Sequence, residues 1–252
     1  MAKHSHWDNI KHKKKINDKK KGAIIAKMGK LITVAVQVAG GNPDENPRLR
    51  LAMDKARSAG VTAEVVDRAI KKAAGEGKNG KAMVEITYEG YAPGGVAMVV
   101  QALTDNRTRT APEIKKLFEK AGGSIGIPGC VAWQFKPKAV FLVGAAAQTG
   151  KANARLDEEQ VMNALIEAGI EPDDLVQEED QVSVAAEASR FDAVSKALIA
   201  AGFTIASADR ILVPENRVPV AAGEPATVVE GLVDSLEEHD DVQEIYHNGE
   251  MP

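Results

Sequence analysis

Lysine and arginine side chains are the groups in this chain with the clearest capacity for binding, and most of them lie near its start. Residues 1–81 carry 19 Lys and Arg against 8 Asp and Glu, whereas residues 82–252 carry 13 against 28. The two parts therefore hold formal charges of +11 and −15, although the net charge of the whole chain is only −4. A field of this shape attracts polyanions at one end and repels them at the other. The charge split predicts a front that faces nucleic acid and an acidic remainder that stays solvated.

The basic residues fall into an N-terminal arm and two segments with helical periodicity. Residues 1–21 are rich in lysine and have almost no hydrophobic periodicity, so we expect a flexible basic arm there. A basic face on either helix alone is typical of an ordinary solvated surface. Together with the arm, and with few acids nearby to neutralise them, these faces favour contacts to phosphates that carry little base information. The candidate contacts are Lys3, His4, Trp7, Lys11, Lys13, Lys14, Lys15, Arg48, Arg50, Arg68, Lys71 and Lys72.

The arm also holds histidines beside a tryptophan. His4, His6 and His12 could in principle bind a metal, but without cysteine, and with Asp8 as the only nearby carboxylate, a zinc site is disfavoured. Trp7 could stack on a base when the arm meets its partner. An exposed tryptophan on a flexible tail is an equally good interpretation. We expect no metal and no cofactor.

A second group of candidate contacts lies between an apolar run and a helical segment. In residues 104–110, Asn106, Arg107 and Arg109 stand out within an otherwise acidic half of the chain. Loops between a strand and a helix often present functional groups, and the two arginines could bind phosphates. Alternatively, Asp105 and Asn106 bond backbone amides while the arginines pair with nearby acids. The sequence does not decide between these two roles.

Patterns typical of enzymes are not found. The chain has no phosphate-loop lysine motif and no nucleophile-elbow serine, and Pro93-Gly94-Gly95 lacks the spacing of a dinucleotide fingerprint. The carboxylate pairs Asp173-Asp174 and Asp240-Asp241 lie in acidic surface context. Cys130, in the strand-like run 130–135, is expected to be a buried structural thiol. We predict a protein that is not an enzyme, with no catalytic residues and no small-molecule substrate.

Composition bears on the location of the protein. A hydrophobic content of 44% is ample for packed cores. The chain shows no run of about 18 apolar residues that would span a bilayer. Its lysine-rich start lacks the apolar centre of a signal peptide. We expect a cytoplasmic protein with no membrane partner.

Three amphipathic helices are predicted in residues 22–80. The first carries an apolar stripe from Ile24 to Val38. Asn46 caps the second helix, which has a proline at its first position, and Thr62 caps the third. Tight connections between such helices indicate a small bundle.

Beyond this bundle the hydrophobic period changes to two. Residues 84–88 alternate between apolar and polar side chains and residues 96–103 are continuously apolar, which predicts two strands. A helix is expected to begin at a Thr110 cap, because Glu113 follows at the spacing of a capping box.

A pattern of helix, glycine and strand then recurs three times, with the glycines at 122, 169 and 202. Each glycine stands where the end of a helix needs a left-handed residue. The repeats suggest ferredoxin-like or related split βαβ layers and an α+β fold class. Lys136-Pro137-Lys138, followed by an expected strand at 140–143, marks a domain boundary.

Five sequence blocks stand out along the chain: His4 to Lys14, Asn46 to Arg50, Arg68 to Lys72, Tyr88 to Gly95 and Thr104 to Thr110. Together they resemble the YebC/PmpR family of transcriptional regulators, which includes the mitochondrial translational activator of cytochrome oxidase. The resemblance implies an N-terminal three-helix bundle at 22–80 and a discontinuous central α/β domain at 81–136 and 210–252. It also implies a ferredoxin-like domain inserted at 137–209.

The same resemblance sharpens the expected function. Family members are described as cytoplasmic DNA-binding transcriptional regulators, which makes DNA the leading expectation for this chain. Others are described as ribosome-associated factors that help translation of proline-rich stretches, which makes ribosomal RNA the rival target. A third alternative is a protein-interaction module that uses the acidic α/β portion.

Overall fold

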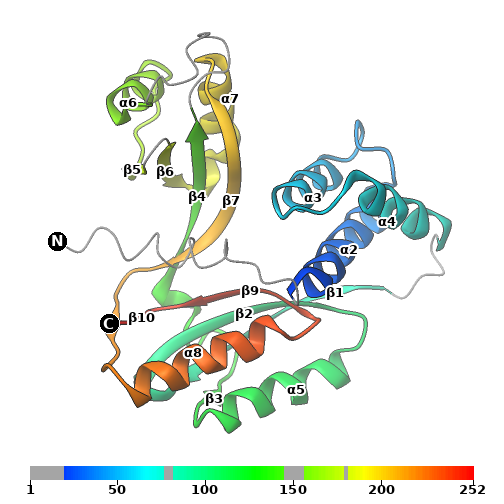
Figure 1. Cartoon of the computed structure of the whole chain (residues 1–252), viewed down its shortest axis with the longest axis vertical. Helices are drawn as coiled ribbons and strands as arrows, with labels where there is room; N and C mark the ends of the chain where they lie inside the picture. Colours follow the sequence, from blue (N-terminus) through cyan, green and yellow to red (C-terminus); the bar gives the residue numbers. More distant parts are fainter. Residues whose placement is uncertain (1–19, 77–81, 145–155, 179–180) are drawn as a thin grey trace. The chain divides into compact units, whose positions relative to one another are not determined.

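The computed structural model describes residues 20–76, 82–144, 156–178 and 181–252 of the chain (Figure 1). The chain divides into two compact units, residues 1–134 with 214–252, and residues 135–213. Helices and antiparallel sheets occur in both, so the predicted α+β class is confirmed. The expected limits of an inserted domain, 137 and 209, lie a few residues inside the second unit.

Three helices at the start of the first unit form a small bundle: α2 (Lys20–Ala39), α3 (Pro47–Ser58) and α4 (Ala63–Glu76). Asn46 caps α3 as predicted, because its side-chain oxygen accepts a hydrogen bond from the backbone N–H of Leu49 at 3.0 Å. Its amide also donates to the carbonyls of Ala35 and Gly40, which fixes the turn that follows α2. The bundle core contains Ile32, Ala35, Val36, Leu49, Ala52, Ala56, Val61, Val66 and Ala73. Val38, the last residue of the predicted apolar stripe, is instead 67% exposed.

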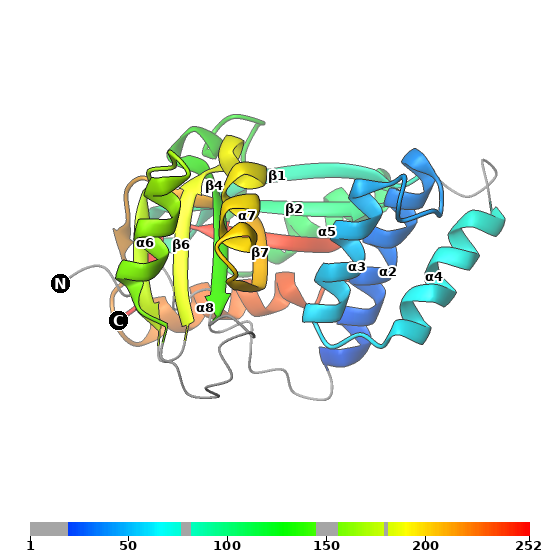
Figure 2. The same cartoon turned by 90° about the horizontal axis from the view of Figure 1, so that it is seen from above.

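The rest of the first unit is an antiparallel sheet in the order β3-β1-β2-β9. Its strands are β1 (Val84–Ala92), β2 (Val96–Thr104), β3 (Ser124–Ile125) and β9 (Val242–His247). Strands β1, β2 and β9 run side by side in Figure 2. A 3₁₀ turn at Pro93–Gly95 joins β1 to β2, and both predicted strands are confirmed. The short strands β8 (Val218–Pro219) and β10 (Gly249–Glu250) pair in parallel.

Two helices, α5 (Arg107–Lys120) and α8 (Glu224–Glu237), cover one face of this sheet (Figure 1). Met98 and Val100 of β2 pack there against Phe118 of α5 and Leu232 of α8. The alternation of side chains along β2 leaves Val99 and Leu103 on the opposite face, and both are also buried. Burial on both faces explains why β2 is continuously apolar in sequence.

The start of α5 differs from the sequence prediction. Asn106, not Thr110, caps the helix, because the Asn106 side chain accepts a hydrogen bond from the backbone N–H of Arg109 at 3.1 Å. Thr110 lies inside the helix and is fully buried. Asn and Thr are both good caps, and the apparent capping box at Thr110 competed with a real cap four residues earlier. Arg107 and Arg109 therefore belong to the first turn of a helix and not to a loop.

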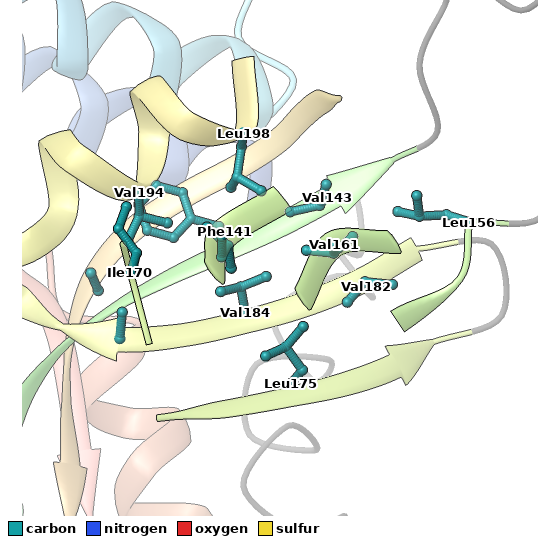
Figure 3. Packing of buried hydrophobic residues seen from close by; sticks show 13 residues of the cluster. Phe141, Val143, Leu156, Val161, Ile170, Leu175, Val182, Val184, Val194 and Leu198 are labelled. Atoms are coloured by element: carbon teal, nitrogen blue, oxygen red, sulfur yellow. The ribbon is translucent and has the colours of Figure 1, made fainter. Parts of the chain in front are cut away.

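The second unit has the element order β4 (Phe135–Gly144), α6 (Glu158–Glu167), β5 (Asp174–Glu178), β6 (Gln181–Glu187), α7 (Phe191–Ala200) and β7 (Thr204–Pro214). Its sheet has the order β5-β6-β4-β7, and β6 is antiparallel to both of its neighbours. A split βαβ arrangement of this kind is typical of ferredoxin-like folds. Figure 3 shows its core, in which Phe141 and Val184 of the sheet lie with Val161 of α6 and Leu198 of α7.

The three predicted helix-ending glycines are confirmed. Gly122, Gly169 and Gly202 have φ values of 78°, 72° and 86°. After each, a backbone N–H returns to a carbonyl in the last turn of the helix, for example Ile170 N–H to the Leu165 carbonyl at 2.8 Å. This is the left-handed helix end for which glycine is favoured, since other residues meet a steric cost there.

Candidate nucleic-acid interface

Seven of the candidate contacts lie outside the described residues and remain predictions from the sequence. The histidines considered as metal ligands, His6 and His12, also lie there together with Asp8. The contacts concerned are Lys3, His4, Trp7, Lys11, Lys13, Lys14 and Lys15.

The basic residues of α4 lie on the face of the helix that points away from the bundle core. Val66 and Ala73 are buried, whereas Arg68, Lys71 and Lys72 are exposed. Their spacings of three and four residues place the three cations on one helical face. Among the described residues, no acidic side chain pairs with Arg68 or Lys71. These two cations can meet a phosphate without first losing a protein partner.

The basic residues of α3, by contrast, already have partners. Arg48 forms an ion pair with Glu85 of β1, and Lys55 forms one with Glu244 of β9 at 2.8 Å. Arg50 donates hydrogen bonds to the carbonyls of Pro43 and Asp44 at 2.8 and 2.9 Å. The sequence placed Arg48 and Arg50 among the candidate phosphate contacts. The structure shows both of them held by other parts of the chain.

A buried carboxylate, Asp241, is the centre of a polar cluster that joins several elements of the first unit. It follows α8 directly before β9 and is only 1% exposed. Lys30 of α2 forms an ion pair with one carboxylate oxygen, and Arg109 of α5 donates to the other at 2.7 Å. The hydroxyls of Thr104 and Thr110 lie 3.1 and 2.7 Å from that second oxygen. Three segments far apart in the chain thus meet at one side chain.

The surroundings of Asp241 keep it ionised. Burial alone would raise the pKa of the Asp241 carboxyl, but the hydrogen bonds from Lys30, Thr110 and Arg109 outweigh this and hold that pKa well below its usual range. A charged carboxylate with such partners is a strong local attachment point. The cluster therefore fixes α2 and the start of α5 to the end of α8.

The predicted second patch is divided by this cluster. Arg109 is held by Asp241 and also lies 3.4 Å from Asp105 and 3.9 Å from Glu113. Asn106 is used as the cap of α5. Arg107 is exposed and makes no ion pair within the described part of the chain. The sequence left open whether the two arginines bind phosphates or pair with acids. Arg109 pairs with acids, and of the two only Arg107 is available to a phosphate.

Lys30 and Asp241 were not singled out by the sequence. The pair Asp240-Asp241 was interpreted as solvated acidic surface, which is wrong for Asp241. An acidic dipeptide after an amphipathic helix resembles an ordinary surface turn, and the partners of Asp241 lie 131 to 211 residues away. No local pattern could have revealed the cluster.

A second buried carboxylate organises the segment after β3. Glu89 of β1 accepts hydrogen bonds from the backbone N–H groups of Gly129, Val131 and Ala132 at 2.7 to 2.9 Å. Burial alone would raise the pKa of the Glu89 carboxyl, but these three donors lower it. The strand predicted at 130–135 is wrong, because residues 132–134 form a 3₁₀ turn that Glu89 holds.

The same segment carries Cys130 and an exposed aromatic residue. Cys130 is half-buried and not fully buried as expected, and burial followed by the nearby Glu89 charge raises the pKa of its thiol. A raised pKa disfavours the reactive thiolate, which agrees with a structural thiol. Trp133 is 69% exposed, and its indole N–H donates to the Cys130 carbonyl at 3.1 Å.

Comparisons with known proteins agree with the fold and with the sequence blocks. Residues 5–76 match the model of the TACO1/YebC protein N-terminal domain, and residues 83–249 match that of the TACO1/YebC second and third domain. The chain belongs to the TACO1/YebC family. The resemblance drawn from the five blocks is thereby confirmed.

Named relatives of this TACO1/YebC chain are described as regulators. A probable transcriptional regulatory protein of Halothermothrix orenii is 42% identical over 252 residues, which cover 100% of this chain and 96% of that protein. The transcriptional regulatory protein PmpR of Pseudomonas aeruginosa is 42% identical, with coverage of 100% and 97%. A conserved hypothetical protein of Aquifex aeolicus, known from a crystal structure, is 38% identical with a TM-score of 0.79, and the match covers 98% of this chain and 97% of that one. The names support a regulatory role.

The described residues of this TACO1/YebC chain contain one group of potential metal ligands, Glu113, His239 and Asp241, whose ligand atoms lie within 4.8 Å of one another. Both oxygens of Asp241 are already engaged by cations. The His239 Nδ1 accepts the backbone N–H of Asp241 at 3.1 Å. Neighbouring cations oppose a divalent ion, so this group fits an internal hydrogen-bond network better than a metal site.

One helix of the described chain, at Gly22–Ala39 in α2, is long and apolar enough to cross a membrane by length and composition. This differs from the expectation that no such stretch exists. Ile32, Ala35 and Val36 of the same helix are buried in the bundle core, and Lys30 is paired with Asp241. One face of this helix therefore packs into the core of the bundle.

Proposed function

We propose that this TACO1/YebC chain is a non-enzymatic cytoplasmic regulator of gene expression that binds duplex DNA through its basic N-terminal part. The single observation that carries the proposal is the face of α4 on which Arg68 and Lys71 are exposed without acidic partners. The relatives are named as transcriptional regulatory proteins, which supports nucleic acid as the partner of this face.

The chemistry of this face fits phosphates and not base edges. Lysine and arginine at spacings of three and four residues form a row of point charges along a helix. Such a row attracts any polyanion, and each phosphate contact releases counterions from the nucleic acid. Base recognition needs side chains placed at the groove edges, whereas phosphate contacts fix the position of the protein and carry no base information. The lysines of the arm would add contacts of the same kind.

A double substitution tests the α4 face. We expect Arg68→Ala with Lys71→Ala to weaken binding to a 30-base-pair duplex and to flatten the plot of log affinity against log salt by about 2 units, since each phosphate contact contributes roughly 0.9. Fluorescence anisotropy at several salt concentrations measures both quantities. The matched control is Lys116→Ala with Lys120→Ala in α5, which removes the same charge from exposed lysines of another helix. Equal effects of the two double variants would contradict the proposed face.

The choice between DNA and ribosomal RNA rests on a different experiment. Phosphate contacts do not distinguish the two, whereas stacking on unpaired bases favours RNA. If structured RNA is the target, Trp7→Ala should cost about 1 to 3 kcal/mol with looped RNA and little with duplex DNA. Crosslinking in cells followed by sequencing of bound DNA and RNA decides the matter. Dominant recovery of ribosomal RNA would replace transcriptional control with a role on the ribosome.

A further inference from the structure

The charge split of this chain is partly neutralised within the molecule. Arg48 and Lys55, both on α3, pair with Glu85 of β1 and Glu244 of β9. Each pair joins a member of the basic N-terminal part to a member of the acidic remainder. Arg48, one of the two α3 cations expected to attract nucleic acid, and its neighbour Lys55 are therefore in contact with the chain's own carboxylates.

The two glutamates lie on the same face of the central sheet. In the antiparallel ladder Glu85 is opposite Leu103, and Glu244 is opposite Gln101. Leu103 and Gln101 are two residues apart on β2, so their side chains point to one face, and cross-strand partners share that face. It is the face opposite Met98 and Val100, which α5 and α8 cover. The sheet thus presents two carboxylates together toward α3.

The contacts of α2 and α3 with the sheet and α8 differ in strength. Lys30 of α2 reaches the buried Asp241, and Lys27 and Lys30 also donate to the carbonyls of Glu237 and Asp240 at 2.6 and 2.8 Å. The Arg48 and Glu85 side chains, by contrast, are 47% and 64% exposed. Exposed ion pairs are weak and are screened by salt, whereas a buried carboxylate with several donors is not easily released. The Arg48–Glu85 pair can therefore open while α2 remains attached. The Lys55–Glu244 pair, whose side chains are 32% and 19% exposed, is the more shielded of the two α3 pairs.

We propose that the acidic face of the central sheet and nucleic acid compete for the same cations of α3, so that binding exchanges Glu85 and Glu244 for phosphates. Lys30 stays on Asp241 during this exchange and keeps the bundle tethered. This inference rests on the proposed function and adds to it a surface that is covered in the free protein. The exchange also favours dense polyanions, because a single phosphate cannot replace both carboxylates.

Neutral substitutions in the sheet test the competition. Glu85→Gln with Glu244→Gln should free Arg48 and Lys55 and raise the affinity for a 30-base-pair duplex by roughly threefold to tenfold. The slope of log affinity against log salt should steepen by up to about 2 units. In the wild-type protein the two glutamates released by α3 take up counterions from solution, which offsets part of the counterion release from the duplex. The glutamines of the variant take up none. The matched control is Glu167→Gln with Glu171→Gln, exposed acids of the second unit, which gives the same change in net charge. An affinity and slope equal to those of this control would overturn the competition.

A distance measurement gives an independent outcome. In a Cys130→Ser background, Ser58→Cys on α3 and Ser235→Cys on α8 place two dyes at exposed positions. Energy transfer between the dyes should fall when the duplex is added at low salt, and should stay high at the same salt concentration without the duplex. Duplex binding without a change in transfer would contradict the competition alone. Failure of both wild-type protein and the Gln variant to bind any duplex would contradict the proposed function itself.

Discussion

Asp241 collects donors from α2, from the end of β2 and from the first turn of α5, and it is the residue on which the arrangement of the first unit depends most directly. Its neighbour Asp240 is exposed, and only its backbone carbonyl takes part, as an acceptor for Lys30. Two adjacent residues of one type therefore have opposite roles. The contrast supplies a matched pair of substitutions.

Asp241→Asn should destabilise the protein by about 2 to 3 kcal/mol, because the neutral amide leaves Lys30 without its carboxylate partner and Arg109 with only the longer contacts to Asp105 and Glu113. Asp240→Asn should change the free energy of unfolding by less than about 0.5 kcal/mol. The folded-state pKa of Asp241 is lowered, so its contribution is fully present above the unfolded-state value of about 4 and is lost only as pH falls through the lower folded value. Urea unfolding of the three proteins between pH 3 and 8 measures this. Equal stabilities of both variants at pH 7 would show that the cluster is dispensable.

At the scale of elements, the helix ends show what the sequence could predict. The Asn46 cap and the glycines at 122, 169 and 202 were predicted because each uses a local interaction within a few residues. The start of α5 was misplaced because Asn106 and Thr110 both satisfy local capping rules. Residues 130–135 were predicted as a strand because their local pattern is apolar. That pattern gives no information about the distant Glu89, which holds the segment as a turn. Local rules succeed where local contacts decide, and fail where a partner far away in the chain decides.

A pair of glycine substitutions should act in opposite directions. Gly169→Ala should destabilise the second unit by about 1 kcal/mol, since its φ of 72° is costly for a residue with a Cβ. Gly231 lies inside α8, and a Cβ there would meet no heavy atom within 4 Å. Gly231→Ala should therefore stabilise the protein by about 0.5 to 1 kcal/mol, because alanine has the higher helix propensity and restricts the unfolded chain. Thermal unfolding of both variants checks the two signs. A stabilised Gly169→Ala variant would show that the helix does not require the left-handed residue.

At the scale of the whole molecule, the structure shows that some of the opposite charges of the two parts are paired with each other, which composition alone could not show. The sequence predicted the split and its preference for polyanions. It could not show that Arg48 and Lys55 are paired with Glu85 and Glu244, because these pairs join positions 37 and 189 residues apart. Among the candidate contacts that the structure describes, Arg68 and Lys71 of α4 and Arg107 of α5 have no acidic partner. Of the candidate contacts, the structure thus separates those that are available from those that are covered.

A double-mutant cycle on Lys55 and Glu244 measures how strongly the two parts are coupled. Lys55→Ala and Glu244→Ala should be non-additive by about 0.5 to 1 kcal/mol in low salt, since the pair is only partly exposed and its atoms are 2.8 Å apart. At 1 M salt the Debye length is about 3 Å, so the coupling should fall toward zero. The control cycle pairs Arg57→Ala with Glu244→Ala, because Arg57 contacts Asp54 of its own helix. Urea unfolding at both salt concentrations gives the coupling energies. A coupling that persists unchanged at 1 M salt would mean that the Lys55–Glu244 pair is shielded from ions in solution, and that nucleic acid could not displace it by electrostatic exchange.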